Sequence, residues 1–171
     1  YMDTRFDEKN IFAADTNFFD IFSFEFVMGD PGTAFFVPHC MILTRETSEK
    51  YFGQANPVGK MLRINDEFEF MVTGVLNDIP QNIHFHFDFL ISYAFLKQVS
   101  TPSWFTWADA GHYNYVLSAP GADIAGLEEK IPEWVLQYVD HGEEVNRDIL
   151  DGNLRFQFTP IRDIHLRSDI R

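Results

Sequence analysis

Apolar residues recur along this chain with two periods, and each period predicts a different kind of element. Alternation of apolar and polar positions is typical of a strand that buries one face of a sheet. The apolar run 39–43 is instead short and continuous, as in a strand that is buried on both faces. The strands predicted from these patterns lie at residues 10–14, 22–26, 39–43, 62–64, 68–74, 85–91, 113–117 and 154–158.

Spacings of three and four residues mark the longest predicted helix. Its apolar stripe consists of Ile124, Leu127, Ile131, Trp134, Val135 and Tyr138. Asp123 is a suitable N-cap, and Pro132 should bend the helix or begin its second half. We expect Trp134 in the core because it belongs to the stripe. A shorter helix is predicted over residues 16–22, after Asp15 as its N-cap.

The most ordered part of the pattern follows the apolar run. Thr44 is a suitable N-cap, and Gly53 is a typical helix stop. Between them, Glu46 and Lys50 stand four residues apart, a spacing that favours an ion pair on the helix surface. A loop and a hairpin come next, and Gly74 in the return strand indicates a bulge or a close approach of two backbones.

Strands mixed with separate helices predict an α+β fold with two lobes. The segment 78–82 contains Asp, Pro and Asn and breaks the pattern, so it is the candidate boundary between the lobes. Segment 94–111 is loosely patterned, and we expect the acidic segment 140–151 to be a loop.

The composition favours a well-packed domain with an acidic surface. The 171 residues include 19 Phe, which is ample material for a core. The 13 basic and 26 acidic residues give a formal charge of −13 and a pI of about 4.7. Binding to a phosphate backbone needs clustered Lys and Arg, so we expect no nucleic-acid partner.

The cysteine content leaves no room for an internal disulfide, because Cys40 is the sole cysteine of the sequence. It belongs to the apolar run, where a buried and inert thiol is expected. Its neighbour His39 would point to the opposite face of a strand, which argues against a cysteine–histidine nucleophile.

The best candidate for a metal site is formed by His84, His86 and Asp88. On a strand these side chains share one face, and two imidazoles with a carboxylate could hold zinc. The same alternation sends the intervening residues to the core, and these are Phe85, Phe87 and Phe89. We therefore predict no metal ligands and expect the polar trio to face solvent, although the sequence leaves metal binding open.

Residues suited to catalysis are present without the context that catalysis needs. Asp163, His165 and Ser168 lack a nucleophile elbow, and no glycine-rich phosphate loop occurs. Most acidic residues should cover the surface, including Glu128, Glu129, Glu143, Glu144, Asp148 and Asp151. Trp104 and Trp107 lie in a loosely patterned segment and are candidates for contact with a partner. We predict no catalytic and no cofactor-binding residues.

Three segments carry more specific motifs. The first, residues 14–31, contains a Phe-rich turn that closes with Gly-Asp-Pro. Another consists of Asp-Ile-Pro at 78–80, Phe-Asp-Phe-Leu at 87–90 and the closing residues 160–166. The most specific is 43–75, which has a helix stop, then Asn-Pro-Val-Gly-Lys at 56–60, then a strand. Together they resemble the periplasmic core domain of MacB-like and FtsX-like ABC transporter permeases.

The resemblance implies an extracytoplasmic insertion between the first and second transmembrane helices of a permease in the inner membrane. Such a domain has a porter-like α/β lobe and a smaller inserted lobe, the sabre. It would place residues 12–80 in the sabre-like lobe, and residues 81–171 with the strand of residues 1–11 in the porter-like lobe. We expect the chain to be a piece of a longer protein, because it begins and ends close to predicted strands.

The function implied is a non-catalytic binding and force-transmitting module for export or lipoprotein handling. Its partners would be a cytoplasmic ATP-binding subunit, a second permease copy, and a periplasmic adaptor or substrate protein. Two alternatives remain open from the residues alone: a periplasmic hydrolase, and a free-standing sensor or adhesion domain. The transported substrate is not determined by the sequence.

Overall fold

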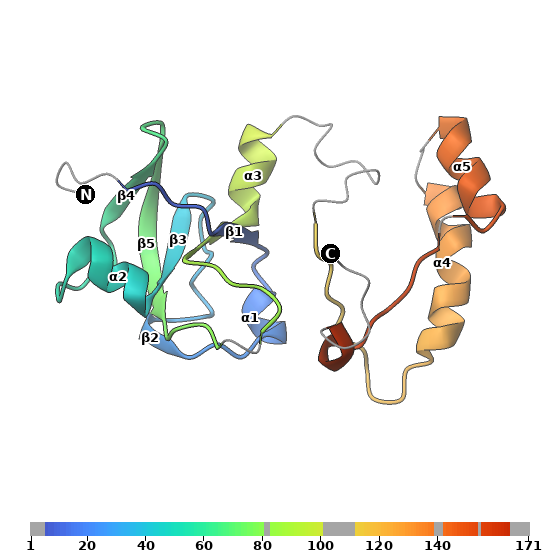
Figure 1. The fold of residues 1–171 in the computed structure, drawn as a ribbon, viewed down its shortest axis with the longest axis horizontal. Coiled ribbons are helices and arrows are strands. Elements are labelled where there is room, and N and C mark those ends of the chain that lie inside the picture. The colour runs from blue at the N-terminus through green and yellow to red at the C-terminus, as the bar shows by residue number, and fades with distance from the viewer. Residues whose placement is uncertain (1–5, 81–82, 101–111, 139–141, 154, 165–171) are drawn as a thin grey trace. The chain divides into compact units, whose positions relative to one another are not determined.

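The computed structural model describes residues 6–80, 83–100, 112–138, 142–153 and 155–164. The chain divides into two compact units, Tyr1–Thr101 and Pro102–Arg171. The first, called the sheet unit here, builds strands and helices around one sheet, and the described part of the second, the helical unit, contains helices and extended segments (Figure 1). The mixture of elements confirms the α+β class.

One mixed sheet of six strands organises the sheet unit (Figure 1). Its strands are β1 (Ile11–Ala14), β2 (Phe26–Gly29), β3 (Cys40–Thr44), β4 (Met61–Ile64), β5 (Phe68–Leu76) and β6 (Phe89–Ser92). The order is β1-β6-β3-β5-β2, and β4 also pairs with β5. Pairing is parallel between β1 and β6 and between β3 and β5, and it is antiparallel elsewhere. The long strand β5 therefore joins β3 on one side to β4 and β2 on the other.

Three helices are described in this unit: α1 (Phe18–Ile21), α2 (Arg45–Phe52) and α3 (Tyr93–Val99). The predicted ends of α2 are confirmed. The Thr44 hydroxyl accepts a hydrogen bond from the Thr47 amide, and Gly53 ends the helix at a φ of 59°. Helix α3 begins similarly, because the Ser92 side chain accepts a bond from the Ala94 amide.

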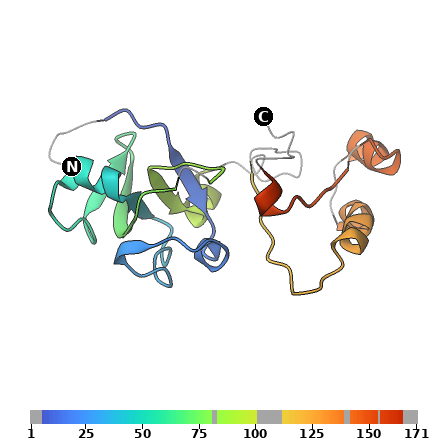
Figure 2. The same ribbon diagram turned by 60° about the horizontal axis from the view of Figure 1, so that its bottom comes forward.

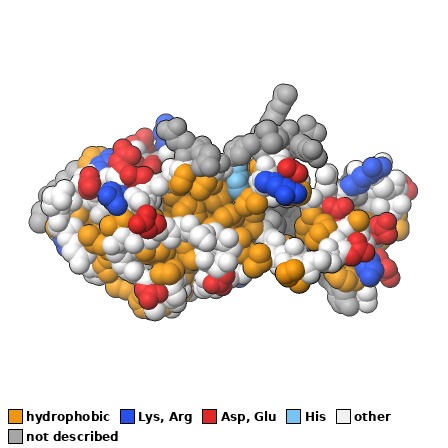
Figure 3. Space-filling model, turned by 90° about the horizontal axis from the view of Figure 1, so that it is seen from below, with side chains coloured by type: hydrophobic (Ala, Val, Ile, Leu, Met, Phe, Trp, Pro, Cys, Tyr) orange, Lys and Arg blue, Asp and Glu red, His pale blue; other side chains and the backbone are white. Residues whose placement is uncertain are grey.

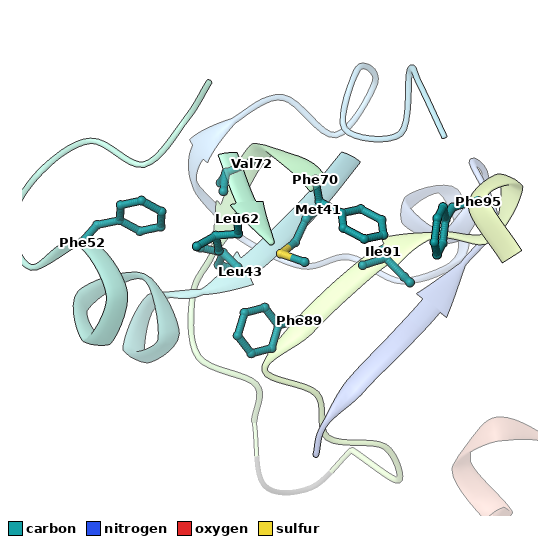
Figure 4. Close-up of a cluster of buried hydrophobic side chains, with 9 residues drawn as sticks. All are labelled: Met41, Leu43, Phe52, Leu62, Phe70, Val72, Phe89, Ile91 and Phe95. Carbon is teal, nitrogen blue, oxygen red and sulfur yellow. The ribbon is translucent and has the colours of Figure 1, made fainter. Parts of the chain in front are cut away.

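The main hydrophobic core lies between one face of the sheet and helices α2 and α3 (Figure 4). Alternate residues of β3, β5 and β6 supply most of it, and α2 and α3 each add one phenylalanine. Its buried members are Met41, Leu43, Phe52, Leu62, Phe70, Val72, Phe89, Ile91 and Phe95. The apolar run at the start of β3 is thus buried on both faces, as its sequence predicts.

The opposite face of the sheet carries a layer of phenylalanine rings. Phe18 of α1 stacks on Phe24 with ring centroids 5.6 Å apart and also contacts Phe87. Phe19 stacks on Phe35 at 5.6 Å and meets Phe26 of β2. Figure 2 brings α1 and β2 forward, and Figure 3 shows hydrophobic side chains gathered on the face where these elements lie. Short, aromatic-rich segments cover this face where the other has α2 and α3.

Gly74 lies at both features that the sequence suggested as alternatives, a bulge and a close approach of two backbones. The register of β5 against β3 shifts between Met41 and Ile42, which leaves Thr73 as the extra residue of a bulge. Opposite Gly74, Gly29 of β2 has a φ of 89°, and a Cβ there would lie 2.4 Å from the Thr73 carbonyl oxygen. Both glycines permit β2 and β5 to approach more closely than side chains would allow.

The helical unit contains α4 (Ile124–Tyr138), α5 (Gly142–Leu150) and the 3₁₀ turn η2 (Ile161–Asp163). The Asp123 side chain accepts a bond from the Gly126 amide, as expected of an N-cap. Helices α4 and α5 contact each other, and Val135 and Ile149 are buried. Trp134 is 49% exposed, so its predicted place in the core is wrong. The apolar stripe of α4 is therefore wider than the face of the helix that is buried in the described part of the unit.

Several predicted elements differ from the structure. Residues 113–117 and 155–158 are not in strands, because alternation alone provides no pairing partner. Helix α5 occupies a segment predicted to be a loop, and α3 begins the segment 94–111, whose residues 101–111 are outside the described ranges. The many acidic residues of this segment obscured the helical spacing of its apolar residues.

The phenylalanine-rich start of the sheet unit also differs from its prediction. Phe22 and Phe24 precede β2 and pack as rings on Phe18. The N-cap of α1 is Asn17, and Asp15 contributes only its backbone oxygen to the Phe18 amide. Ring packing thus overrides the local alternation.

The compact units divide at Thr101 and Pro102, whereas the sequence suggests a boundary near residue 80. Strand β6 pairs with both β1 and β3, so residues on both sides of position 80 share one sheet. The assignment of residues 12–80 to a sabre-like lobe and of 1–11 with 81–171 to a porter-like lobe stays a prediction.

Candidate functional site

A shallow groove opens where β2, β4 and β5 meet in the sheet unit. Its floor is the middle of β5, from Met71 to Thr73, next to the bulge. One wall is the end of β2 with the turn that follows it, which contributes Phe36. The facing wall is the loop before β4, which contributes Val58 and Gly59. These segments are far apart in the sequence, and β5 brings them together because both β2 and β4 pair with the same edge of it.

The walls are held by backbone hydrogen bonds. The Gly59 amide donates to the Val72 oxygen at 2.8 Å, and the Val72 amide donates to the Lys60 oxygen at 2.8 Å. Across the groove, the Thr73 hydroxyl donates to the Ala34 oxygen at 2.7 Å and so ties the turn after β2 to β5. The groove therefore has a fixed shape before any ligand arrives.

Four apolar side chains in and beside the groove are named here the methionine surface: Phe36, Val58, Met61 and Met71. Met61 and Met71 face each other across the β4–β5 pair and therefore share one face of the sheet. Phe36 is 60% exposed, Met61 47% and Val58 36%, while Met71 is half-buried. Exposed apolar side chains gathered beside one groove are a candidate site of interaction.

Charged groups border the methionine surface. The Arg63 guanidinium lies 2.7 Å from the Glu69 carboxylate, one pair further along the same face. Glu69 raises the pKa of Arg63 through this hydrogen bond and through its charge. Asp30 lines the groove at its other end, and its side chain also accepts a bond from the Gly32 amide. An apolar centre with a polar border is the usual anatomy of a protein interface.

The trio predicted as the best metal candidate does not form a metal site among the residues that the structure describes, where no group of three suitable side chains occurs. His86 is exposed, and Asp88 accepts a hydrogen bond from the Asn10 side chain at 3.0 Å. The His84 ring contacts the ring of Phe85. Phe85, Phe87 and Phe89 are buried as expected, but residues 85–88 are not in a strand, because β6 begins at Phe89. Phe87 packs against Phe18 whereas Phe89 belongs to the main core, so the predicted single core face is wrong.

Cys40 is buried, and its thiol donates to the Val37 oxygen. Burial raises the pKa of this thiol, which keeps it protonated and weakly nucleophilic. The His39 ring packs against Phe70 and Phe95, on the core side of the sheet. The inert thiol predicted from the sequence thus has a matching environment.

The residues considered for hydrolysis are not brought together in the described ranges. His165, Ser168, Trp104 and Trp107 lie outside these ranges, as do the side chains of Glu143 and Glu144. Two of the other carboxylates accept hydrogen bonds within the helical unit. Glu128 accepts a bond from the Phe158 amide, and Asp148 accepts one from the Asn153 side chain.

In the part of the chain that the structure describes, no helix has the length and apolar character needed to cross a bilayer.

A comparison with protein families identifies the class of the domain. The sequence model of the MacB-like periplasmic core domain matches residues 1–134. The chain therefore belongs to this family, whose members are extracytoplasmic domains of ABC transporter permeases. The resemblance recognised in the sequence motifs is confirmed.

The chain is similar to two solved structures, and the first of them shares its fold. A crystallised domain of a protein described as a permease from Porphyromonas gingivalis is 20% identical, with a TM-score of 0.54, and the match covers 75% of this chain and 58% of that one. The periplasmic region of MacB from Actinobacillus actinomycetemcomitans is 16% identical, with a TM-score of 0.49, over 72% of this chain and 53% of that one. This chain thus spans little more than half the length of these two structures. No curated protein matches it.

Sequence reasoning did not find the groove. Its residues come from three segments between Gly29 and Thr73, and none of these segments carries a recognised binding motif. A signal was nevertheless present. Met61 and Met71 occupy positions on the polar side of the alternation in the β4–β5 hairpin, where exposed apolar residues need an explanation.

Proposed function

We propose that this chain is a non-catalytic binding and force-transmitting module of an ABC-type permease for export or lipoprotein handling. The observation that carries the proposal is an exposed apolar groove with fixed walls in a domain of the MacB-like family. A preformed groove suits docking, and a sheet in which every strand is hydrogen-bonded to a neighbour suits the transfer of load. Binding then needs no chemistry from the domain itself.

The proposal includes the partners and the location of the whole protein. A cytoplasmic ATP-binding subunit supplies the energy, and a second permease copy completes the membrane part. The domain lies in the periplasm, where an adaptor or substrate protein reaches the groove. The acidic surface, with a formal charge of −13, keeps such a domain soluble.

Distance measurements on the full-length permease test the force-transmitting part of the proposal. Gln54, in the exposed turn after α2, is replaced by Cys and spin-labelled after other accessible cysteines are removed. Cys40 is buried and can remain. We expect the distance between the labels of two copies to change when the assembled transporter binds ATP. A subunit variant unable to bind ATP serves as the control, and an unchanged distance would refute the proposal.

A further inference from the structure

We infer that the methionine surface receives one bulky apolar side chain from an extended loop of a periplasmic protein, and that this side chain has a Lys or Arg beside it. The inference rests on the proposed function and names the part of the domain that performs the docking. It concerns the sheet unit alone, whose groove is formed entirely by residues 29–73.

The apolar centre of the surface suits a single anchoring side chain. Phe36, Val58 and Met71 all line the groove, and they come from the turn after β2, the loop before β4 and β5 itself. A large apolar group in the groove would cover surface that Phe36 and Val58 now expose to water. Complete burial of such a side chain contributes about 1.5–3 kcal/mol, which is a large share of the free energy of a transient complex.

Two properties of the surface favour a loop over a flat partner. The backbone of the groove is fixed by the hydrogen bonds of Gly59 and Val72, so a partner does not have to order it. The side chains of Met61 and Met71 are unbranched and polarizable, and they can adapt to anchors of somewhat different shape. A rigid frame with adaptable contacts accepts a protruding residue.

The charges around the groove indicate the sign of the charge that a partner should carry. Arg63 is neutralised by Glu69, so this pair adds no net charge to the border. Asp30 lines the groove with a carboxylate, and Lys60, the neighbour of Gly59, is directed to the other face of the sheet over the Phe52 ring. The charge that remains at the groove is negative, as is the formal charge of the whole chain. A cationic side chain next to the anchor complements it.

The test uses methyl signals of the methionines, which report directly on the surface. The 171-residue chain is prepared with ¹³C-methyl methionine, and the signals are assigned by single Met→Leu variants. The probe is the peptide acetyl-Gly-Lys-Gly-Phe-Gly-Lys-Gly-amide, titrated into the millimolar range. We expect the Met61 and Met71 signals to shift with saturation, while the signal of Met41, which is buried in the core, stays in place.

Matched peptides separate the two parts of the inference. Replacing the central Phe of the peptide by Ala should weaken binding about tenfold or more, because the anchor is lost. Replacing both Lys by Glu should weaken it several-fold, and the difference should shrink as salt is added. Equal binding of all three peptides would overturn the inference, and so would the absence of shifts at both methionines.

Variants of the chain locate the binding. Val58→Asp puts a charge into the groove and should abolish the shifts at Met61 and Met71. Val99→Asp is the control, because Val99 is a 45% exposed valine on α3 and does not line the groove. Binding that survives Val58→Asp overturns the inference. A melting curve of each variant shows whether the fold is retained, and Val58→Ala replaces the aspartate variant if it is not.

Two other occupants of the surface are distinguished in the same samples. Shifts that appear with protein concentration alone would assign the surface to a second copy of this chain. Equal shifts with octyl glucoside would assign it to a lipid-like molecule. Either result overturns the inference. Failure here leaves the spin-label experiment on the permease unaffected, so the docking site and the proposed function can fail separately.

Discussion

The Lys50 ammonium of α2 lies 2.6 Å from the Glu8 carboxylate in the segment that leads into β1. The Tyr51 hydroxyl donates to the same carboxylate oxygen at 2.9 Å, and Lys50 also lies over the ring of Phe6. The Glu8 side chain is only 13% exposed. These contacts fasten the chain before β1 to the helix that covers the core, whereas the sequence suggested an ion pair between Lys50 and Glu46.

The Glu8 contacts predict an asymmetric pair of stability changes. Glu8→Ala removes both hydrogen bonds and leaves the Tyr51 hydroxyl without its acceptor, so we expect a loss of about 1–3 kcal/mol. Lys50→Ala should cost less, about 0.2–1 kcal/mol, because the lysine is 42% exposed and screened by solvent. Urea denaturation of both single variants and the double variant gives the coupling energy. A coupling of zero would show that the ion pair does not contribute.

The same contacts predict a loss of stability at high pH. Burial and the Glu8 carboxylate raise the pKa of Tyr51. The fold therefore favours the protonated hydroxyl, and this contribution is fully present below the pKa of an unfolded tyrosine, about 10. It is lost as the pH rises above that value, because the unfolded chain releases the proton first. In Tyr51→Phe, the free energy of unfolding should fall less steeply as the pH rises above ~10, which urea denaturation at several pH values would measure. Tyr115 is present in both proteins, so its contribution cancels in the comparison.

Two phenylalanines provide a comparison between core and surface. Phe70 of β5 is fully buried in the main core, whereas Phe36 borders the groove and is exposed. Phe70→Ala should lower the free energy of unfolding by about 3–5 kcal/mol. Phe36→Ala should change it by no more than about 0.5 kcal/mol. If Phe36→Ala proved as destabilising as Phe70→Ala, Phe36 would be a structural residue and not part of an interaction surface.

Alanine substitutions at two glycines with positive φ distinguish the cost of a steric clash from the cost of backbone strain. Gly29 and Gly59 have φ angles of 89° and 83°, and an added Cβ would meet the Thr73 oxygen only at Gly29. Gly59→Ala should therefore cost about 1–3 kcal/mol from conformational strain. Gly29→Ala should cost more and should also disturb the pairing of β2 with β5. Amide hydrogen exchange at β2 would show this disturbance, and equal melting temperatures for the two variants would contradict it.

Local signals in the sequence predicted those elements whose causes are local. Helix α2 begins after Thr44 and ends at Gly53 as expected, because a cap and a C-terminal glycine act within a few residues. The apolar run of β3 and the bulge next to Gly74 were recognised for the same reason. Family motifs then supplied the class of protein, which no single residue could.

Features that depend on distant partners could not be predicted. Residues 113–117 alternate like a strand, but a strand also needs a neighbour, and the described residues offer none there. Trp134 belongs to an apolar stripe whose width exceeds what α5 covers. The groove requires β2 and the loop before β4 to meet on the same edge of β5, a relationship that exists only in three dimensions.

The strand order has a mechanical consequence for any pull on the chain before β1. Strand β1 is at one edge of the sheet, and the groove lies at the other edge, where β2 and β4 flank β5. The path from β1 to that edge runs through β6, β3 and β5 in turn, and each step is a ladder of backbone hydrogen bonds. A displacement of the chain before β1 would thus reach the groove through three consecutive strand pairings.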